Sequence, residues 1–113
     1  PFVALKDWPM GMSAHVVYEE IDDLPATISP KMIGLIRKEI GFDGLLISDD
    51  ISMEALGGSL AERSTAALAA GCDVILHCNG RLDDMQQIAA ASGVLNPEGQ
   101  RRALAALHRR CDP

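Results

Sequence analysis

The stretch GFDGLLISDDIS, residues 41–52, decides how the chain folds. Gly41 is expected to end a preceding helix, because glycine adopts the left-handed conformation after a helix at the least steric cost. An apolar run without polar alternation follows at residues 45–47. Such a run between helical patterns is typical of a parallel strand that is buried on both faces. We therefore predict a buried parallel strand that ends at residues 48–50.

This predicted strand ends in Ser48, Asp49 and Asp50. In parallel α/β folds the chemistry takes place at the carboxyl ends of the strands, so a carboxylate there is a candidate catalytic group. A structural interpretation stays open beside this one, in which the two aspartates start a loop and cap the next helix. The spacing alone does not decide between them.

Composition limits the class of protein and its compartment. The chain has 113 residues, 48% of them apolar, which suits one small domain with its own core. Its formal net charge of −6 argues against nucleic acid as a partner. No stretch has the length of a membrane span, so we expect no membrane partner. Three cysteines without a C-x-x-C spacing argue against a disulfide framework and favour the cytoplasm.

Outward from residues 41–52, strand and helix patterns alternate. Ser29 and Pro30 predict a helix start, and Ser59 with Glu62 forms a capping box. The patterns predict strands at 10–17, 45–47 and 73–76, helices at 30–40, 60–70, 82–91 and 98–110, and a short helical turn at 53–56. This alternation implies an α/β fold with right-handed crossovers and a parallel sheet.

Side-chain patterns also predict what is buried. We expect Cys72 and Cys78 to be small buried residues and the two arginine pairs 101–102 and 109–110 to form a solvated helix face. The helical periodicity predicts the following inward side chains: Met32, Ile33, Leu35, Ile36, Ile40, Met85, Ile88, Ala89, Leu104 and Leu107.

All three predicted strands end in polar side chains, namely His15, then residues 48–50, then residues 77–79. If the strands are parallel, these groups gather along one rim. A metal site of His15, Asp49, His77 and Cys78 is one interpretation, although no H-x-H or H-x-x-x-H pair supports it.

Three further interpretations apply to this rim. A phosphate-accepting aspartate would need a cation from a late strand, but the last lysine is Lys38. A carboxylate nucleophile of a glycosidase fits an aspartate at a rigid strand end, and it needs a second group as general acid. The fourth interpretation is an inert scaffold or binding fragment.

Residues 35–39 and 44–52, LIRKE and GLLISDDIS, resemble the active-site signature of family 3 glycoside hydrolases. The segments PMGMSAHVVY (9–18), LPATISP (24–30) and AAGCDVILHCN (69–79) resemble the bacterial β-N-acetylhexosaminidase branch of that family, which acts in cytoplasmic peptidoglycan recycling. The resemblance covers almost the whole chain.

The resemblance implies a TIM-type (β/α)8 barrel and a retaining mechanism with Asp49 as the nucleophile. It implies that Asp50 serves the loop or caps a helix, and we expect His15 and Asp50 to line the substrate pocket. The implied substrate is an amino-sugar conjugate with terminal β-linked N-acetylglucosamine, on anhydro-muramic acid or a muropeptide. No metal or organic cofactor is implied.

The chain departs from the family in its length. A TIM barrel takes about 250 residues, and residues 1–113 supply about three βα units, so we expect a partial barrel domain formed by its C-terminal part. The family's acid/base motif, Lys-His-Phe-Pro-Gly-His, has no match here, and the family's sugar-holding groups lie upstream. We therefore expect the chain to be inactive alone and to associate with an upstream barrel segment or with itself.

Overall fold

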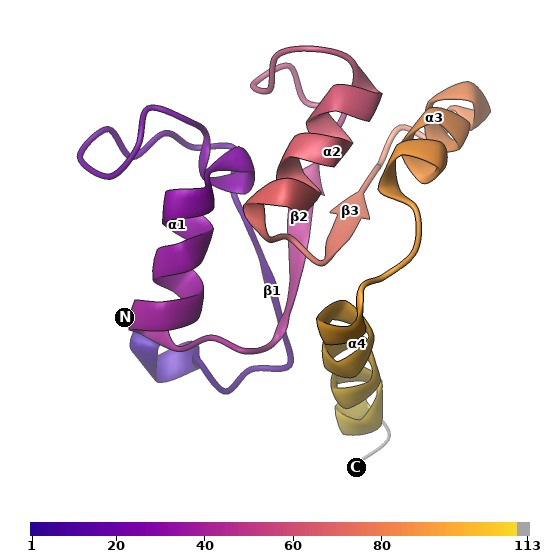
Figure 1. The fold of residues 1–113 in the computed structure, drawn as a ribbon. Helices are drawn as coiled ribbons and strands as arrows, with labels where there is room; N and C mark the ends of the chain where they lie inside the picture. Colours follow the sequence, from indigo (N-terminus) through magenta and orange to yellow (C-terminus); the bar gives the residue numbers. More distant parts are fainter. Residues whose placement is uncertain (111–113) are drawn as a thin grey trace.

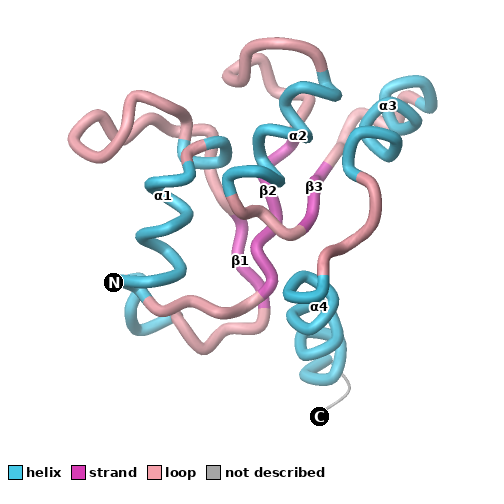
Figure 2. The backbone as a smooth tube through the Cα atoms, in the orientation of Figure 1, coloured by secondary structure: helices cyan, strands magenta, loops and turns pink. Residues whose placement is uncertain are grey.

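The computed structural model describes residues 1–110, and its core is a parallel three-stranded sheet. The strands β1 (Met10–Met12), β2 (Leu45–Asp50) and β3 (Val74–Leu76) lie in the order β1-β2-β3, so the strand predicted at 45–47 is the middle one. Both strand pairs are parallel, with Gly11 opposite Leu46 and Ile47 opposite Val74. The predicted α/β fold with parallel strands is confirmed (Figures 1 and 2).

Four α-helices connect or follow the strands: α1 (Pro30–Leu35), α2 (Leu60–Ala70), α3 (Leu82–Ser92) and α4 (Pro97–Arg110). Short 3-10 turns occur at Phe2–Leu5 and Ala26–Ile28. The predicted caps are present, since Ser29 accepts from the Met32 N–H and Ser59 forms the reciprocal capping box with Glu62. Gly41 takes the left-handed conformation, with φ of 78°.

The predicted helix at 30–40 is α-helical only as far as Leu35. Residues Ile36–Ile40 form a wider π turn, and the Phe42 N–H donates to the Ile36 carbonyl. Within this turn the Arg37 guanidinium donates to the carbonyls of Phe42 and Gly44, and it lies 5.4 Å from the centre of the Phe42 ring. The wider turn therefore coincides with the arginine that holds the connection into β2.

Two predicted elements are wrong in extent. The predicted strand at 10–17 stops at Met12, because residues 14–17 turn away to pair with the segment 25–27 through the Thr27 and Ala26 N–H groups. The predicted helical turn at 53–56 is a series of turns. These turns nevertheless bury Leu56, which is 1% exposed.

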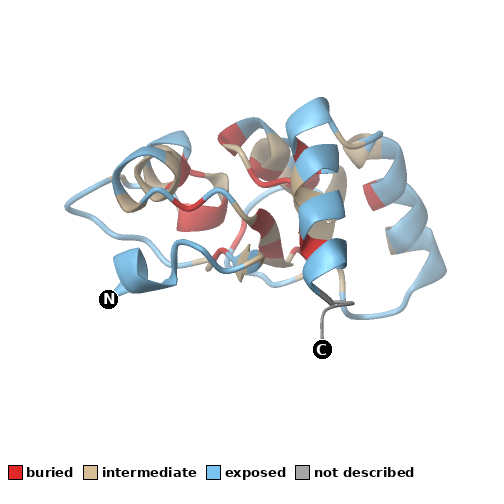
Figure 3. Cartoon of the chain, turned by 90° about the horizontal axis from the view of Figure 1, so that it is seen from below, coloured by how far each residue is buried: buried red, intermediate tan, exposed pale blue. Residues whose placement is uncertain are grey.

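The hydrophobic core lies between the sheet and the helices α1, α2 and α3 (Figure 3). Phe42 packs against Gly11, and a side chain at Gly44 would lie 2.6 Å from both the Phe42 ring and the Trp8 carbonyl oxygen. The connection into β2 therefore requires glycine. The buried members of the core are Ile33, Phe42, Leu46, Ile51, Leu56, Ala67, Ala70, Cys72 and Ile88.

Several predictions of inward side chains on the late helices are wrong. Leu104 and Leu107 are 60% and 56% exposed, Met85 is 49% exposed, and Ala89 is exposed as well. Cys78 is also exposed, whereas Cys72 is buried as predicted, and burial raises the pKa of its thiol to about 11. Among residues 97–109 of helix α4, only Gly99 and Ala106 are buried. Apolar packing therefore contributes little to the attachment of α4 to the rest of the chain.

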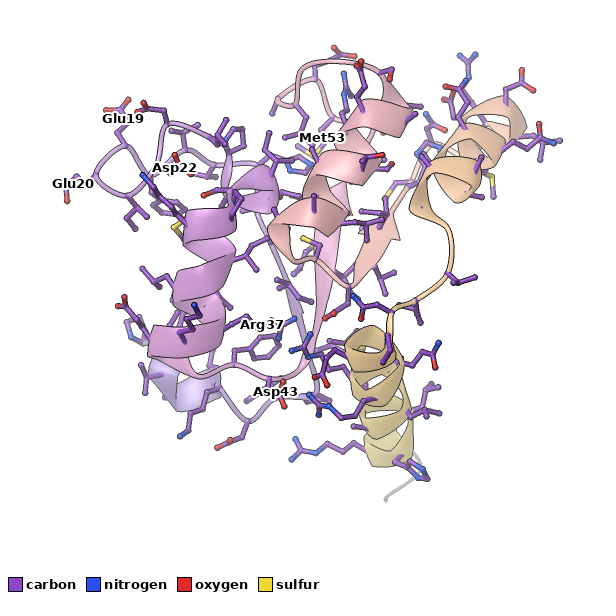
Figure 4. All side chains as sticks on the ribbon, viewed as in Figure 1. Glu19, Glu20, Asp22, Arg37, Asp43 and Met53 are labelled. Atoms are coloured by element: carbon purple, nitrogen blue, oxygen red, sulfur yellow. The ribbon has the colours of Figure 1, made fainter. Side chains whose placement is uncertain are left out.

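Helix α4 is held by an ionic cluster of Arg37, Asp43, Asp73, Arg101 and Arg102, two of which are labelled in Figure 4. The Asp73 side chain is 3% exposed, and its two oxygens accept from Arg37 at 2.7 Å and from Arg102 at 2.9 Å. Asp73 also accepts from the Leu46 N–H of β2. The prediction that the pair 101–102 forms a solvated helix face is therefore wrong for Arg102. The predicted exposure of Arg110 falls on a side chain outside the described residues.

The face of the sheet opposite the core carries exposed apolar side chains. Side chains alternate along a strand, and Gly11 faces Phe42 in the core, so Met10 and Met12 lie on the other face. They are 51% and 58% exposed. Within residues 1–110, β1 and β3 each pair with β2 alone, so the sheet has two open edges.

None of the helices within residues 1–110 is both long and apolar enough to cross a membrane.

Candidate active site

Polar groups that follow all three strands meet at Asp50, although the His77 ring lies at a cavity between β3 and α3 instead. The His15 imidazole, just after β1, lies with Nε2 2.8 Å from the carbonyl oxygen of Asp50 at the end of β2. The Cys78 N–H, after β3, donates to the Asp50 carboxylate at 3.3 Å. The carboxyl ends of the strands thus converge on residues 49–50.

Asp49 is partly buried, and its carboxylate is little engaged. Its Oδ1 accepts one hydrogen bond, from the N–H of Asp50 at 2.8 Å. No other partner of this carboxylate is found among residues 1–110 of the structure, so Oδ2 stays available. Asp49 does not cap the following helix α2, whose N-cap is Ser59. The capping interpretation of the aspartate pair therefore does not apply to Asp49.

Asp50, in contrast, is fully occupied in holding the loop after β2. Its carboxylate accepts from the N–H of Ser52, from the Ser52 hydroxyl at 2.8–2.9 Å and from the N–H of Cys78. Burial would raise the pKa of Asp50, but the hydrogen bonds from Ser52 and Cys78 outweigh it and hold the pKa below its ordinary value. The carboxylates of Asp49 and Asp50 thus have different hydrogen-bond partners. That Asp50 lines a substrate pocket stays a prediction.

The lowered pKa of Asp50 gives an expected pH dependence of stability. A carboxyl group with a lower pKa in the folded state stabilises the fold above its unfolded pKa, about 3.9, and loses that contribution as the pH falls through the folded value. We expect the Asp50→Asn variant to lose less stability than the wild type between about pH 6 and pH 3. Urea unfolding at both pH values measures this, and equal losses in the two proteins would contradict it. Asp22 and Asp43, whose pKa values are also lowered, are expected to contribute to the drop in both proteins.

His15 is held at both ring nitrogens rather than packed among apolar side chains. Its Nδ1 lies 2.8 Å from the hydroxyl of Thr27, which in turn lies 2.9 Å from the hydroxyl of Ser13. Sequence reasoning missed Thr27, because the contact joins the segments after β1 and before α1 and no local pattern signals it. Whether His15 lines a substrate pocket stays a prediction.

His77 and Cys78 take no part in a metal centre here. Across residues 1–110, no three side chains of His, Cys, Asp or Glu lie together in a way that could hold a metal ion. Both ring nitrogens of His77 are buried without a described partner, beside a cavity of about 630 Å³ between β3 and α3. The structure therefore offers no ligand set for the metal-site interpretation.

Comparison with known proteins identifies relatives along nearly the whole chain. Residues 1–105 match the family model described as the glycosyl hydrolase family 3 N-terminal domain. A beta-hexosaminidase of Tolumonas auensis is 43% identical over 93 residues, which are 80% of this chain and 27% of that protein. A beta-hexosaminidase of Idiomarina loihiensis is 40% identical over 106 residues, 90% of this chain and 32% of that protein. The chain thus spans about a third or less of the length of these relatives.

Solved structures show the same architecture. NagZ from Neisseria gonorrhoeae, in complex with N-trifluoroacetyl-D-glucosamine, aligns with a TM-score of 0.70 and 34% identity over 82% of this chain and 26% of its own. A family 3 β-N-acetylglucosaminidase from Paenibacillus aligns with a TM-score of 0.74 and 27% identity over 88% of this chain and 21% of its own. The three-stranded unit described above is therefore a part of the fold that these larger proteins contain.

Proposed function

The chain belongs to glycoside hydrolase family 3, and on this premise we propose that it supplies the nucleophile Asp49 to a β-N-acetylhexosaminidase. The proposal rests mainly on one observation, the contrast at the end of β2. Asp49 keeps a carboxylate oxygen without a described partner, whereas Asp50 is bound by Ser52 and Cys78. An ionised, rigidly placed carboxylate is what attack on an anomeric carbon requires.

The proposed reaction has two steps. An Asp49 oxygen forms a bond to the anomeric carbon, while the bond from that carbon to the leaving oxygen breaks and an acid protonates that oxygen. Water then attacks the same carbon, returns the electron pair to Asp49 and gives its proton to the conjugate base of the acid. Two inversions at one carbon retain the anomeric configuration.

The proposed substrate is a conjugate that ends in β-linked N-acetylglucosamine, on anhydro-muramic acid or a muropeptide. Two comparisons support an amino-sugar: the relatives from Tolumonas and Idiomarina are named beta-hexosaminidases, and the Neisseria structure holds an N-acylated glucosamine. We place the reaction in peptidoglycan recycling in the cytoplasm. The free thiols of Cys72 and Cys78 are consistent with a reducing compartment.

We propose that the general acid comes from another polypeptide segment that completes the barrel. Residues 1–113 contain no match to the family's acid/base motif. The sheet has two open edges, and Met10 and Met12 are exposed on its uncovered face. Open edges and uncovered apolar faces favour association with further strands. The segment upstream in the full-length relatives is the proposed partner, and self-association is the alternative outcome.

The proposal predicts that the 113-residue chain alone does not hydrolyse a disaccharide that ends in β-linked N-acetylglucosamine, whose leaving group is a sugar hydroxyl. Without an acid, the leaving oxygen would depart as an alkoxide, which is unfavourable by roughly 10²–10⁴-fold in rate. Adding the upstream part of the Tolumonas auensis beta-hexosaminidase, expressed separately, is expected to restore turnover. Size-exclusion chromatography of the mixture shows whether the two parts associate. Full turnover by the chain alone would refute the proposed division of the catalytic groups.

A further inference from the structure

We propose that His15 is a positioning residue, which fixes the strand-end backbone that carries Asp49. The inference rests on the proposed function of Asp49 and adds a role for the histidine after β1. The His15 imidazole bridges the end of β2 to the buried segment before α1, through one hydrogen bond at each ring nitrogen.

The hydrogen bonds determine the tautomer of the neutral ring. The Asp50 carbonyl oxygen can only accept, so the Nε2 atom that lies 2.8 Å from it must carry a proton. In the neutral ring, Nδ1 then accepts from the hydroxyl of Thr27, at 2.8 Å. Thr27 is 0% exposed and Ser13 is 6% exposed, so this second contact is shielded from water. Buried, fully satisfied polar networks of this kind hold one arrangement of side chains.

The bonded carbonyl belongs to the residue that follows the proposed nucleophile. All the polar groups of Asp50 are engaged: its N–H by Asp49, its carbonyl by His15 and by the Met53 N–H, and its carboxylate by Ser52 and Cys78. Asp50, the residue directly after Asp49, is therefore held at its N–H, its carbonyl and its carboxylate. A displacement of about 1 Å in a reacting group can lower a rate by about 10²-fold, so a loosened strand end would slow attack by Asp49.

Two pairs of variants separate positioning from simple packing. Thr27→Val removes the hydroxyl at constant shape, and Thr27→Ser keeps it. His15→Phe fills the space without hydrogen bonds, and His15→Gln keeps a donor for the Asp50 carbonyl. Thr65→Val is the matched control, because the Thr65 hydroxyl is exposed and bonds only to the Ala61 carbonyl within α2. None of these variants removes Asp49.

The kinetic test is covalent labelling by 2-acetamido-5-fluoro-glucosyl fluoride, followed by intact mass, in the chain combined with the upstream segment of the Tolumonas relative. We expect Thr27→Val and His15→Phe to lower the labelling rate constant by about 10- to 100-fold with an unchanged half-saturating concentration. Thr27→Ser, His15→Gln and Thr65→Val should stay within about threefold of wild type. Unchanged labelling in Thr27→Val and His15→Phe would overturn the inference.

A second measurement uses the 113-residue chain alone and no activity. Nitrogen-15 NMR should show the neutral His15 ring as the Nε2-protonated tautomer, and Thr27→Val should shift the Asp49 and Asp50 amide resonances while Thr65→Val does not. An Nδ1-protonated tautomer, or unmoved amides, would overturn the inference. If wild type is never labelled at Asp49, the proposed function fails, and NMR still decides whether His15 fixes this backbone.

Discussion

Asp49→Asn is expected to lower hydrolysis of an N-acetylglucosaminide by the completed barrel by roughly 10⁴-fold or more, the scale of loss when a catalytic nucleophile is removed. Asparagine keeps the shape of aspartate and the oxygen that accepts from the Asp50 N–H, so the strand end should keep its form. It lacks the negative charge needed to attack the anomeric carbon. Initial rates with a chromogenic substrate, together with a circular dichroism spectrum, measure both properties.

Asp50→Asn is the matched control for this experiment, since the two positions are adjacent and both substitutions replace aspartate by asparagine. Its carboxylate binds Ser52 and Cys78 and has no proposed role in bond formation. We expect its turnover to stay within about tenfold of wild type, because its change acts only through the position of the strand end. The account is contradicted if Asp50→Asn is the variant that abolishes turnover and Asp49→Asn is not.

Asp73→Ala is expected to lower the free energy of unfolding by about 3–5 kcal/mol, the usual loss when one partner of a buried ion pair is removed. The substitution leaves Arg37 and Arg102 facing each other with side chains only 16% and 15% exposed, and it removes the acceptor of the Leu46 N–H. Burial and repulsion by Arg102 already lower the pKa of the Arg37 guanidinium in the native protein, while Asp73 opposes this effect. Urea unfolding followed by circular dichroism gives the free energies.

Arg101→Gln serves as the control for Asp73→Ala. Arg101 contacts Asp43 and Glu98, but these side chains are between 48% and 63% exposed, and exposed pairs contribute about 0–1 kcal/mol. We therefore expect Arg101→Gln to leave the free energy of unfolding nearly unchanged, in contrast to Asp73→Ala. Equal effects of the two variants would show that the ionic cluster does not attach α4 in the way described.

The elements that could be predicted from sequence are those fixed by local signals. Gly41, with its positive φ, ends the first helix, and the capping box of Ser59 and Glu62 starts α2. The uninterrupted apolar run at 45–47 predicts a buried parallel strand, and β2 pairs in parallel with both β1 and β3. The parallel order then brings the polar strand ends to one rim.

The errors lie where contacts between distant segments override local patterns. Leu104 and Leu107 have helical spacing but are exposed, because α4 attaches through Arg102 to Asp73, a residue 29 positions away. No helical periodicity reveals that contact. In the same way, no local sequence pattern predicts the two hydrogen bonds of the His15 ring. One nitrogen lies beside the Thr27 hydroxyl and the other beside the Asp50 carbonyl. Networks of polar groups depend on the assembled fold, which a reading of local sequence does not contain.

The central claim is that Asp49 forms the covalent bond to the sugar. Its most direct test is to incubate the chain, combined with the upstream segment of the Tolumonas auensis relative, with 2-acetamido-5-fluoro-glucosyl fluoride and to sequence the labelled peptide by mass spectrometry. The account predicts one sugar adduct, located on Asp49 and absent from Asp49→Asn. An adduct on another residue, or no adduct on an associated complex, would contradict it.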